Sequence, residues 1–211
     1  MTRGRFITLE GGEGAGKSTQ LRHLAARLRA LGTEVLETRE PGGSTGAEEI
    51  RELLIHGDSG RWDAETEALL ISAARRDHLV RRVWPALEAG QWVLCDRFAD
   101  STLAYQGYGQ GLDLGLLGEL YRMVAGAFAP DLTLILDLPV ETGLRRAAER
   151  RAGGERFESM DRSFHERLRK GVLDIAAREP ARCRVIDAAG SQEEIADRIA
   201  AAVAERLDLR L

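Results

Sequence analysis

A glycine-rich segment near the N-terminus carries the residues best suited to binding phosphate. Residues 10–19, EGGEGAGKST, place Gly11, Gly16, Lys17 and Ser18 at the spacing G-x-x-x-x-G-K-[ST]. Glycines let successive backbone N–H groups converge on phosphate oxygens, a lysine can bridge the terminal phosphates, and a serine hydroxyl can ligate Mg²⁺. The pattern therefore predicts a nucleoside triphosphate site. Its expected contacts are the loop residues Gly11, Gly12, Glu13, Gly14, Ala15, Gly16, Lys17, Ser18 and Thr19.

A second group of chemically useful residues follows the apolar segment 91–96 (QWVLCD), which Asp96 ends and Arg97 extends. An open parallel sheet binds its ligand at the carboxyl ends of its strands. Asp96 is therefore expected to hold Mg²⁺ together with Ser18, and Arg97 to bind a phosphate group. Asp137, at the end of another apolar segment, is a competing metal ligand, although it could equally support a helix start.

The number of arginines exceeds what one triphosphate needs. Arg39, Arg75 and Arg97 all fall near predicted strand ends or on the long helical pattern that precedes segment 91–96. Together with Lys17 they suggest a second phosphorylated ligand, which would accept the transferred group. The alternative is that the helical arginines merely solvate a surface.

The elements that must position these residues follow from the hydrophobic pattern. Strands are predicted at 6–10, 34–38, 91–96, 132–138 and 183–187. Helical spacing follows the glycine-rich loop as far as Leu31 and recurs over 47–56 and 63–89, where Pro85 is a candidate break or kink. Strands that alternate with helices predict one α/β domain, residues 1–211, around a five-stranded parallel sheet flanked by helices.

Composition excludes several classes of protein. A net charge of −4 and a pI near 5.7 argue against a nucleic-acid-binding protein. Cys95 and Cys183 lack metal-ligand spacing and are expected as free thiols of a reducing compartment, rather than as a disulfide or a metal site. No segment approaches about twenty consecutive apolar residues, so we expect a cytoplasmic protein without a membrane partner.

At this point the motifs form a recognisable combination, which resembles bacterial thymidylate kinase. The similarity extends from about Arg5 to the final helix. It is carried by LEGGEGAGKST, TREPGG (38–43), AAR (73–75), DRFADST (96–102), AYQGYGQG (104–111) and PDLTLILDL (130–138). The resemblance implies a P-loop kinase fold and transfer of a phosphoryl group from ATP·Mg²⁺ to dTMP. It also implies a homodimer.

The resemblance also implies roles on the acceptor side. Glu13 would lie near the sugar 3′-hydroxyl, which accounts for a carboxylate inside an anion-binding loop. Arg97 would bind the acceptor phosphate and Arg75 the thymine edge, while Tyr105 and Gln106 would line the sugar and base pocket. The full set of implied acceptor contacts is Glu13, Arg39, Ile71, Arg75, Arg97, Ser101, Tyr105 and Gln106.

Two positions depart from the family pattern. Ile71, one helical turn before Arg75, stands where the family usually places a phenylalanine that stacks on the base. The loss of offset stacking is worth about 1 kcal/mol. Gln110 stands where the family commonly has an arginine, so either one cation fewer lines the acceptor site or another arginine replaces it.

The arginine-rich segment 145–158, RRAAERRAGGERFE, resembles the mobile lid of those thymidylate kinases that lack a basic residue in the phosphate loop. Here Gly14 and Ala15 stand in the loop, so it has no such basic side chain. Arg150, Arg151 or Arg156 would then stabilise the transferring phosphoryl group, with Gly153 and Gly154 as hinges. The alternative is a solvated helix whose glutamates pair with these arginines.

Because a phosphate oxygen is already largely deprotonated, the expected reaction needs no strong general base. The four histidines are therefore expected as surface or helix residues: His23, His56, His78 and His165. Two other functions stay open. A nucleoside kinase would need a carboxylate base, for which Glu13 or Glu40 is available, and a nucleotide-gated switch would bind a protein partner without acceptor-dependent turnover.

Overall fold

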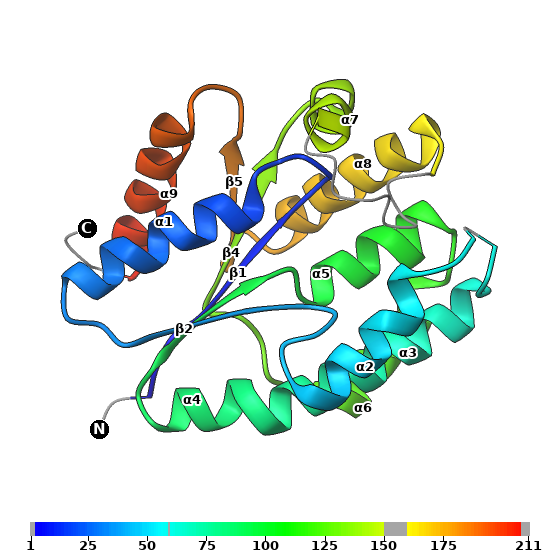
Figure 1. Ribbon diagram of the computed structural model, residues 1–211, viewed down its shortest axis with the longest axis horizontal. Coiled ribbons are helices and arrows are strands. Elements are labelled where there is room, and N and C mark those ends of the chain that lie inside the picture. Colours follow the sequence, from blue (N-terminus) through cyan, green and yellow to red (C-terminus); the bar gives the residue numbers. More distant parts are fainter. Residues whose placement is uncertain (1–2, 59, 150–159, 208–211) are drawn as a thin grey trace.

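A parallel sheet forms the centre of the molecule (Figure 1). The computed structural model describes residues 3–58, 60–149 and 160–207. The strands follow the order β2-β3-β1-β4-β5, and every neighbouring pair is parallel, which confirms the predicted five-stranded parallel sheet. Their bounds are β1 (Phe6–Gly11), β2 (Val35–Arg39), β3 (Trp92–Asp96), β4 (Leu132–Asp137) and β5 (Cys183–Asp187).

Helices cover both faces of the sheet. The helices α1 (Lys17–Ala30) and α9 (Gln192–Leu207) pack on one face, whereas α4 (Trp84–Glu88), α5 (Ala99–Thr102) and α8 (Arg162–Arg178) pack on the other. The other helical elements are α2 (Thr45–Ile55), α3 (Ala64–His78), α6 (Leu114–Ala125) and α7 (Val140–Glu149), with the π-helical segments η1 (Leu79–Val83) and η2 (Leu103–Gly109). Of these, α2 packs on α3 and α3 on α6, beside the sheet (Figure 1).

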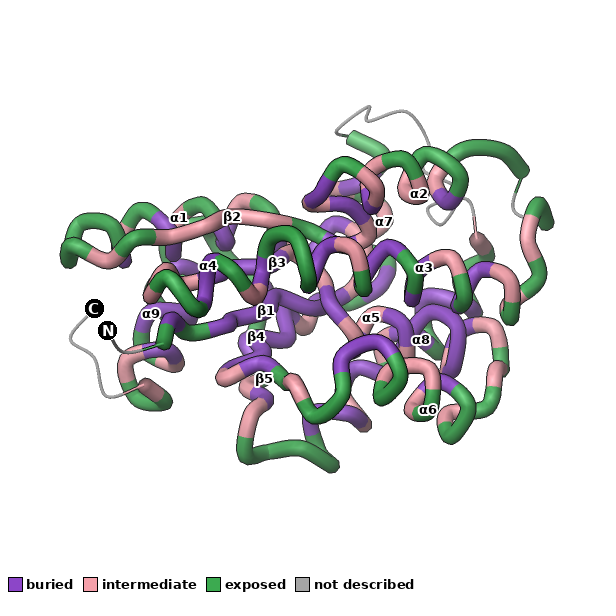
Figure 2. Tube along the Cα trace, turned by 90° about the horizontal axis from the view of Figure 1, so that it is seen from below, coloured by how far each residue is buried: buried purple, intermediate pink, exposed green. Residues whose placement is uncertain are grey.

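Burial of the strands on both faces explains their near-continuous apolar sequences. Ile7 of β1 packs in a cluster with Leu24 of α1 and Ile199 of α9, while its neighbour Phe6 packs in another cluster with Leu87 of α4. Successive side chains of a strand point to opposite faces, so each face needs its own apolar set. In Figure 2 the central strands are accordingly buried, and exposed residues follow the outer sides of the helices.

The helical pattern predicted over 63–89 is correct in extent, and at Pro85, the candidate break or kink, the helix changes its geometry without ending. Helix α3 passes through the π-helical η1 into α4, with Pro85 in the first turn of α4. Trp84 N–H donates to Leu79 O, five residues back, instead of four. A proline lacks the N–H of a regular helix and its ring crowds the preceding turn. The wider π turn directly before it accommodates both effects.

Because the strands are parallel, the loops after β1, β2 and β3 all lie on the side of the sheet where the strands have their carboxyl ends. From β1 the chain crosses to β2 on one side of the sheet, and from β3 it crosses to β4 on the other. The crevice between β1 and β3 is therefore the point where strand order reverses, which is where open α/β sheets bind ligands. Within the described residues, no helix is both long enough and apolar enough to cross a membrane.

Candidate active site

The loop after β1 leads directly into α1. Gly16, with φ of 90°, precedes the first helical residue, and α1 has neither a side-chain cap nor an acidic residue in its first turn. Its backbone N–H groups are thus left for an anion. Lys17 folds over the loop and donates to Gly11 O at 3.1 Å and Gly12 O at 2.8 Å. Burial, followed by repulsion from Arg97, lowers the pKa of Lys17 to about 8.

Close packing against α7 explains why the loop carries no extra basic residue. A Cβ at Gly14 would lie 1.9 Å from Gly143 O, and a Cβ at Gly143 would lie 2.3 Å from Glu13 O. No side chain fits between these two backbone segments. Position 14 therefore cannot carry a second cation in addition to Lys17.

The two predicted metal ligands are brought together. Ser18 Oγ donates to Asp96 Oδ2 at 2.5 Å, which joins the start of α1 to the end of β3. A hydroxyl beside a carboxylate suits Mg²⁺, which keeps several waters and takes its other ligands from phosphates. Asp137, the competing candidate, is instead held by Arg169, whose Nε and Nη2 donate to its carboxylate at 2.7 and 3.0 Å. The geometry therefore favours Asp96.

Arg97 occupies a tight turn after β3 and has a positive φ of 70°, which is uncommon for a residue with a side chain. Glu10 stabilises this turn by accepting from Phe98 N at 2.7 Å and from Ser101 Oγ at 2.5 Å. Burial, and then the nearby Asp100, raise the pKa of Glu10 to about 7, although both hydrogen bonds oppose the shift. The strained turn aims the Arg97 side chain back across the crevice.

The contacts of Glu13 explain why an anion-binding loop can contain a carboxylate. Its Oε1 accepts from Arg97 Nη2 at 2.8 Å and from Tyr105 Oη at 2.5 Å. Burial would raise the pKa of this carboxyl, but Arg97, Lys17 and the Tyr105 hydroxyl outweigh it and lower the pKa to about 2. Glu13 is therefore an ionised bridge between the phosphate loop and the acceptor side.

The acceptor side is built by α3 and the ends of β2 and β3. Arg75 is 3% exposed and donates from Nε to Glu40 Oε2 at 2.7 Å and from Nη2 to Thr102 Oγ1 at 2.9 Å. Ile71 lies one turn before it on the same helix and is also buried. Arg39 is half exposed and pairs with Glu48 of α2.

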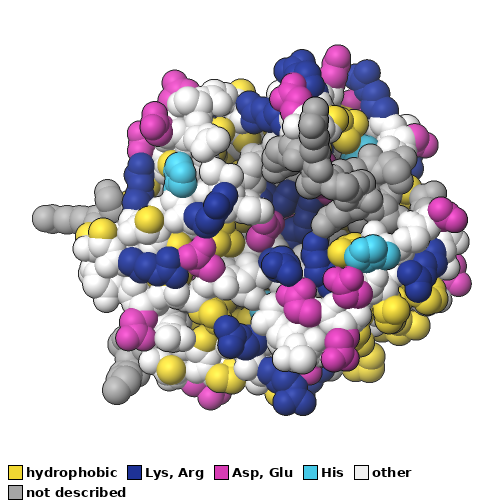
Figure 3. Space-filling view, in the orientation of Figure 1, with side chains coloured by type: hydrophobic (Ala, Val, Ile, Leu, Met, Phe, Trp, Pro, Cys, Tyr) yellow, Lys and Arg dark blue, Asp and Glu magenta, His cyan; other side chains and the backbone are white. Residues whose placement is uncertain are grey.

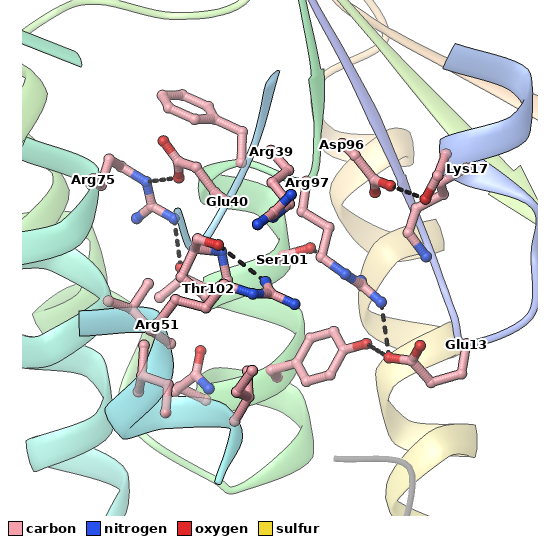
Figure 4. A pocket seen from close by; sticks show the side chains of 18 of the residues that line it. Glu13, Lys17, Arg39, Glu40, Arg51, Arg75, Asp96, Arg97, Ser101 and Thr102 are labelled. Atoms are coloured by element: carbon pink, nitrogen blue, oxygen red, sulfur yellow. Dashed lines mark hydrogen bonds and ion pairs between the residues drawn. The ribbon is translucent and has the colours of Figure 1, made fainter. Parts of the chain in front are cut away.

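One cavity of about 350 Å³ unites most of these side chains. Figure 3 shows it as a hollow in which Lys and Arg side chains gather, and in Figure 4 Arg97 lies between Lys17 on one side and Arg75 on the other. The sequence-predicted residues that line it are Glu13, Gly14, Gly16, Lys17, Ser18, Arg39, Ile71, Arg75, Asp96, Arg97, Ser101, Tyr105 and Gln106. A volume in this range suits a small ligand.

Several predicted residues do not line this cavity. Gly11 and Gly12 contribute through the carbonyls that hold Lys17, whereas Ala15 is buried in the core. Thr19 lies in the first turn of α1 without lining the cavity. Gln110 donates to Glu67, as does Gln106. The lid arginines Arg150, Arg151 and Arg156 fall outside the described residues.

Comparison with known proteins decides the family. The family model described as thymidylate kinase matches residues 9–199. A thymidylate kinase of Caulobacter vibrioides is 57% identical over 209 residues, which cover 99% of this chain and 100% of that protein. One from Rhizorhabdus wittichii is 53% identical over 205 residues, covering 97% and 99%. The chain belongs to the thymidylate kinase family.

Solved structures agree with this assignment. The crystal structure of thymidylate kinase from Ehrlichia chaffeensis matches with a TM-score of 0.77 and 35% identity, covering 95% of this chain and 99% of that one. The resemblance inferred from the motifs is thus confirmed, together with the P-loop kinase fold. A nucleotide-gated switch is not favoured for a member of the thymidylate kinase family.

Two residues of this thymidylate kinase fold were missed by the sequence reasoning. Glu10 was treated only as the end of a strand, although its partners Phe98 and Ser101 make it the support of the Arg97 turn. Arg51 of α2 lines the cavity, and in Figure 4 it points toward the middle with Arg39 and Arg97. The only available signal was its place in the helix after the REPGG segment.

The four histidines are surface or helix residues, as expected, but two of the helical ones are buried. His78 is completely buried, its Nδ1 lies 2.9 Å from Glu40 Oε1, and its Nε2 lies 2.7 Å from Thr38 Oγ1. His165 is buried near the start of α8. Both are helical, as expected, but a helical position did not reveal which face each histidine occupies.

Proposed function

We propose that this protein transfers the γ-phosphoryl group of ATP to dTMP, giving ADP and dTDP. The observation that carries the proposal is one cavity with cationic groups at two ends, Lys17 at the phosphate loop and Arg75 on α3, with Arg97 between them. One triphosphate would occupy the loop end. The remaining positive charge suits a second phosphorylated guest, and residues 1–211 would form a single nucleoside monophosphate kinase domain.

On the donor side, the N–H groups at the start of α1 would hold the ATP phosphates and Lys17 would bridge the β- and γ-phosphates. Binding would replace the two loop carbonyls that Lys17 now contacts. Ser18 and Asp96 would hold Mg²⁺, which neutralises charge on the phosphates when bound.

On the acceptor side, Arg97 would bind the dTMP phosphate, with Arg39 and Arg51 nearby. Arg75 would face the base edge, while Tyr105, Gln106 and Ser101 would complete the pocket. Ile71 would cover the base by dispersion and buried area instead of aromatic stacking. Glu13, ionised beside Arg97, would accept a hydrogen bond from the sugar hydroxyl.

The contacts of the carboxylates favour a phosphate acceptor over a nucleoside hydroxyl. A nucleoside kinase would need a base, and the two candidates are Glu13 and Glu40. Glu13 has a pKa lowered to about 2 and is held by Arg97, and Glu40 accepts from Arg75 and His78. The lowered pKa makes Glu13 a weak base, and both carboxylates already accept hydrogen bonds within the protein. A phosphate oxygen of dTMP needs no such base.

The lid arginines complete the proposal. Because Gly14 packs on Gly143, the loop cannot carry a second cation at position 14 in addition to Lys17. One of Arg150, Arg151 and Arg156 would supply this second cation. Single alanine replacements should lower kcat sharply for at least one of the three; if none does, the lid assignment is wrong.

We also propose a cytoplasmic homodimer. Cys95 and Cys183 are free and buried, as suits a reducing compartment. Large exposed apolar side chains occur on neighbouring helical elements: Leu69 of α3, Val80 of η1, and Leu116 and Met123 of α6. Burial of these side chains against a second copy would remove them from water. Sedimentation of Leu69→Glu should report monomers, whereas an unchanged dimer would exclude this face.

The decisive experiment is a coupled assay of ADP release over a panel of acceptors. We expect turnover with dTMP, weaker turnover with dUMP and none above background with thymidine. Faster turnover with thymidine would support the nucleoside kinase, and ATP binding without acceptor-dependent turnover would support the switch.

A further inference from the structure

A buried series of hydrogen bonds begins at Arg75 and Glu40 in the cavity wall and continues behind the wall to β2. Arg75 Nε donates to Glu40 Oε2 at 2.7 Å, and His78 Nδ1 lies 2.9 Å from the other oxygen of the same carboxylate. His78 Nε2 in turn lies 2.7 Å from Thr38 Oγ1. We propose that Glu40 and His78 are positioning residues, which fix the Arg75 guanidinium toward the acceptor base. The inference rests on the proposed function, since it concerns the arginine proposed to face that base.

The contacts of Arg75 define the direction of its remaining donors. A guanidinium is planar with its five N–H groups in a fixed fork, so bonds from two of its nitrogens set the orientation of the third. Nε is taken by Glu40 and Nη2 by Thr102. Among the hydrogen bonds between described residues, none uses Nη1. Phe98 lies under the group, with its ring centroid 5.2 Å from the guanidinium carbon.

Burial makes this arrangement rigid. Glu40 is 4% exposed, Arg75 3% and His78 0%. A buried carboxylate and guanidinium must stay paired, because either one alone would carry a large desolvation cost. Both ring nitrogens of His78 have a partner, since Nδ1 lies against the Glu40 carboxylate and Nε2 against the Thr38 hydroxyl. In a low-dielectric interior such bonds are strong and oriented.

The local sequence brings these groups together. Arg75 and His78 are three residues apart on one face of α3, and Thr38 and Glu40 are two residues apart at the end of β2. The turn that follows encloses the contact: a Cβ at Gly43 would lie 2.4 Å from Thr38 Oγ1 and 2.5 Å from His78 Nε2. The REPGG segment therefore serves to close this network as well as to line the cavity.

Orientation of Arg75 should determine which bases are accepted. Arginine has only donors, so a fixed Nη1 favours a base edge that presents a carbonyl oxygen and disfavours one that presents an amino group. An unfixed guanidinium could turn away from an unfavourable amino group. Loss of Glu40 or His78 should therefore weaken dTMP binding and also reduce discrimination against dCMP.

The test is steady-state kinetics of Glu40→Gln with dTMP, dCMP and ATP. Loss of a bond to a charged group should raise the KM for dTMP about tenfold or more, and should lower the ratio of kcat/KM for dTMP to that for dCMP. The KM for ATP should stay within about twofold. Asp77→Asn is the matched control, since Asp77 lies beside His78 but accepts from Ser44 and Arg81 instead. It should leave both KM values unchanged.

A double-mutant cycle separates positioning from general structural support. In an Arg75→Met background, Glu40→Gln should add nothing to the KM for dTMP, because the residue through which it acts is gone. If the increase in the KM for dTMP in the double mutant equals the product of the increases in the two single mutants, the inference is overturned. If Glu40→Gln does not fold, Thr38→Val can be used instead. This change removes only the hydrogen bond between Thr38 and His78, at a half-buried site. It should raise the KM for dTMP but not that for ATP, and equal rises in both would overturn the inference.

The proposed function is tested separately by the wild-type protein. Absence of dTMP turnover by the wild type would overturn that function and this inference with it. Wild-type turnover of dTMP, combined with an unchanged KM for dTMP in Glu40→Gln, would overturn this inference alone.

Discussion

Nη2 of Arg97 lies 2.8 Å from Oε1 of Glu13, so the arginine that follows β3 is paired with the carboxylate inside the loop that follows β1. This contact spans the point of the sheet where strand order reverses. It directs the Glu13 carboxylate at Arg97, the arginine proposed to bind the acceptor phosphate. This contact therefore joins the phosphate loop to the proposed acceptor pocket.

Replacement of Glu13 should affect the acceptor more than the donor. Glu13→Gln keeps the size of the side chain but removes the charge that holds Arg97 and Tyr105, so the KM for dTMP should rise about tenfold and that for ATP much less. Steady-state kinetics with each substrate varied in turn would measure this. Glu205→Gln, an exposed site on α9, is the control, and equal losses for both substrates would mean that Glu13 does not serve the acceptor.

Replacement of Lys17 should separate catalysis from folding. Lys17→Ala removes the cation expected at the transferring phosphoryl group, so kcat should fall by about 10²–10³ or more. Burial lowers the pKa of Lys17 to about 8, so the folded chain holds this ammonium group at a desolvation cost, and its removal should not unfold the protein. Circular dichroism and thermal unfolding should stay close to those of the wild type. Near-normal kcat would refute the role of Lys17.

Stability should depend on pH through Glu10. Its pKa is raised to about 7 in the folded chain, so between about pH 4.5 and 7 the folded state retains a proton that the unfolded state has lost. The free energy of unfolding of the wild type, relative to Glu10→Gln, should therefore fall as the pH rises through this window, by at most about 3 kcal/mol. Urea unfolding at pH 5 and pH 8 measures the difference.

Glu13→Gln provides the contrast in the same experiment. The pKa of Glu13 is lowered to about 2, so the stability gained from its ionisation is present above about pH 4.5 and is lost as the pH falls toward 2. Its difference from the wild type should therefore stay flat between pH 5 and pH 8. If the difference in unfolding free energy between Glu10→Gln and the wild type is also independent of pH, Glu10 does not have the raised pKa described here.

The contact between the phosphate loop and α7 should not tolerate a methyl group. Gly143→Ala would place a Cβ 2.3 Å from Glu13 O, so the backbone must move, at a cost of about 1–3 kcal/mol. Gly118→Ala, in the middle of α6 with no atom within 4 Å of its Cβ, should instead stabilise the protein by up to about 1 kcal/mol. Thermal unfolding compares the two. Equal stability of both variants would contradict the close approach.

The sequence predicted correctly the residues that lie near the carboxyl ends of the strands. Asp96 ends β3 and Arg97 follows it, while Lys17 and Ser18 begin the helix after the loop that follows β1. Parallel strands bring their carboxyl ends to one side of the sheet. The convergence of these four residues was therefore predictable before any coordinate was known. The family resemblance added the acceptor roles, which spacing alone did not provide.

The remaining features depend on contacts between distant segments. Glu10 meets Ser101 across 91 residues, and Glu40 meets His78 across 38, and neither partner is marked by a local pattern. The π-helical turn before Pro85 likewise reflects how a long helix fits its surroundings. A histidine on an amphipathic helix gave no sign that it would be completely buried.

The most direct test of the central claim is a calorimetric titration of dTMP into protein saturated with a non-hydrolysable ATP analogue and Mg²⁺. A single cavity that holds both guests at once predicts saturable binding of one dTMP per chain in the presence of the analogue. Mutual exclusion of the two ligands, or no saturable dTMP site, would contradict it.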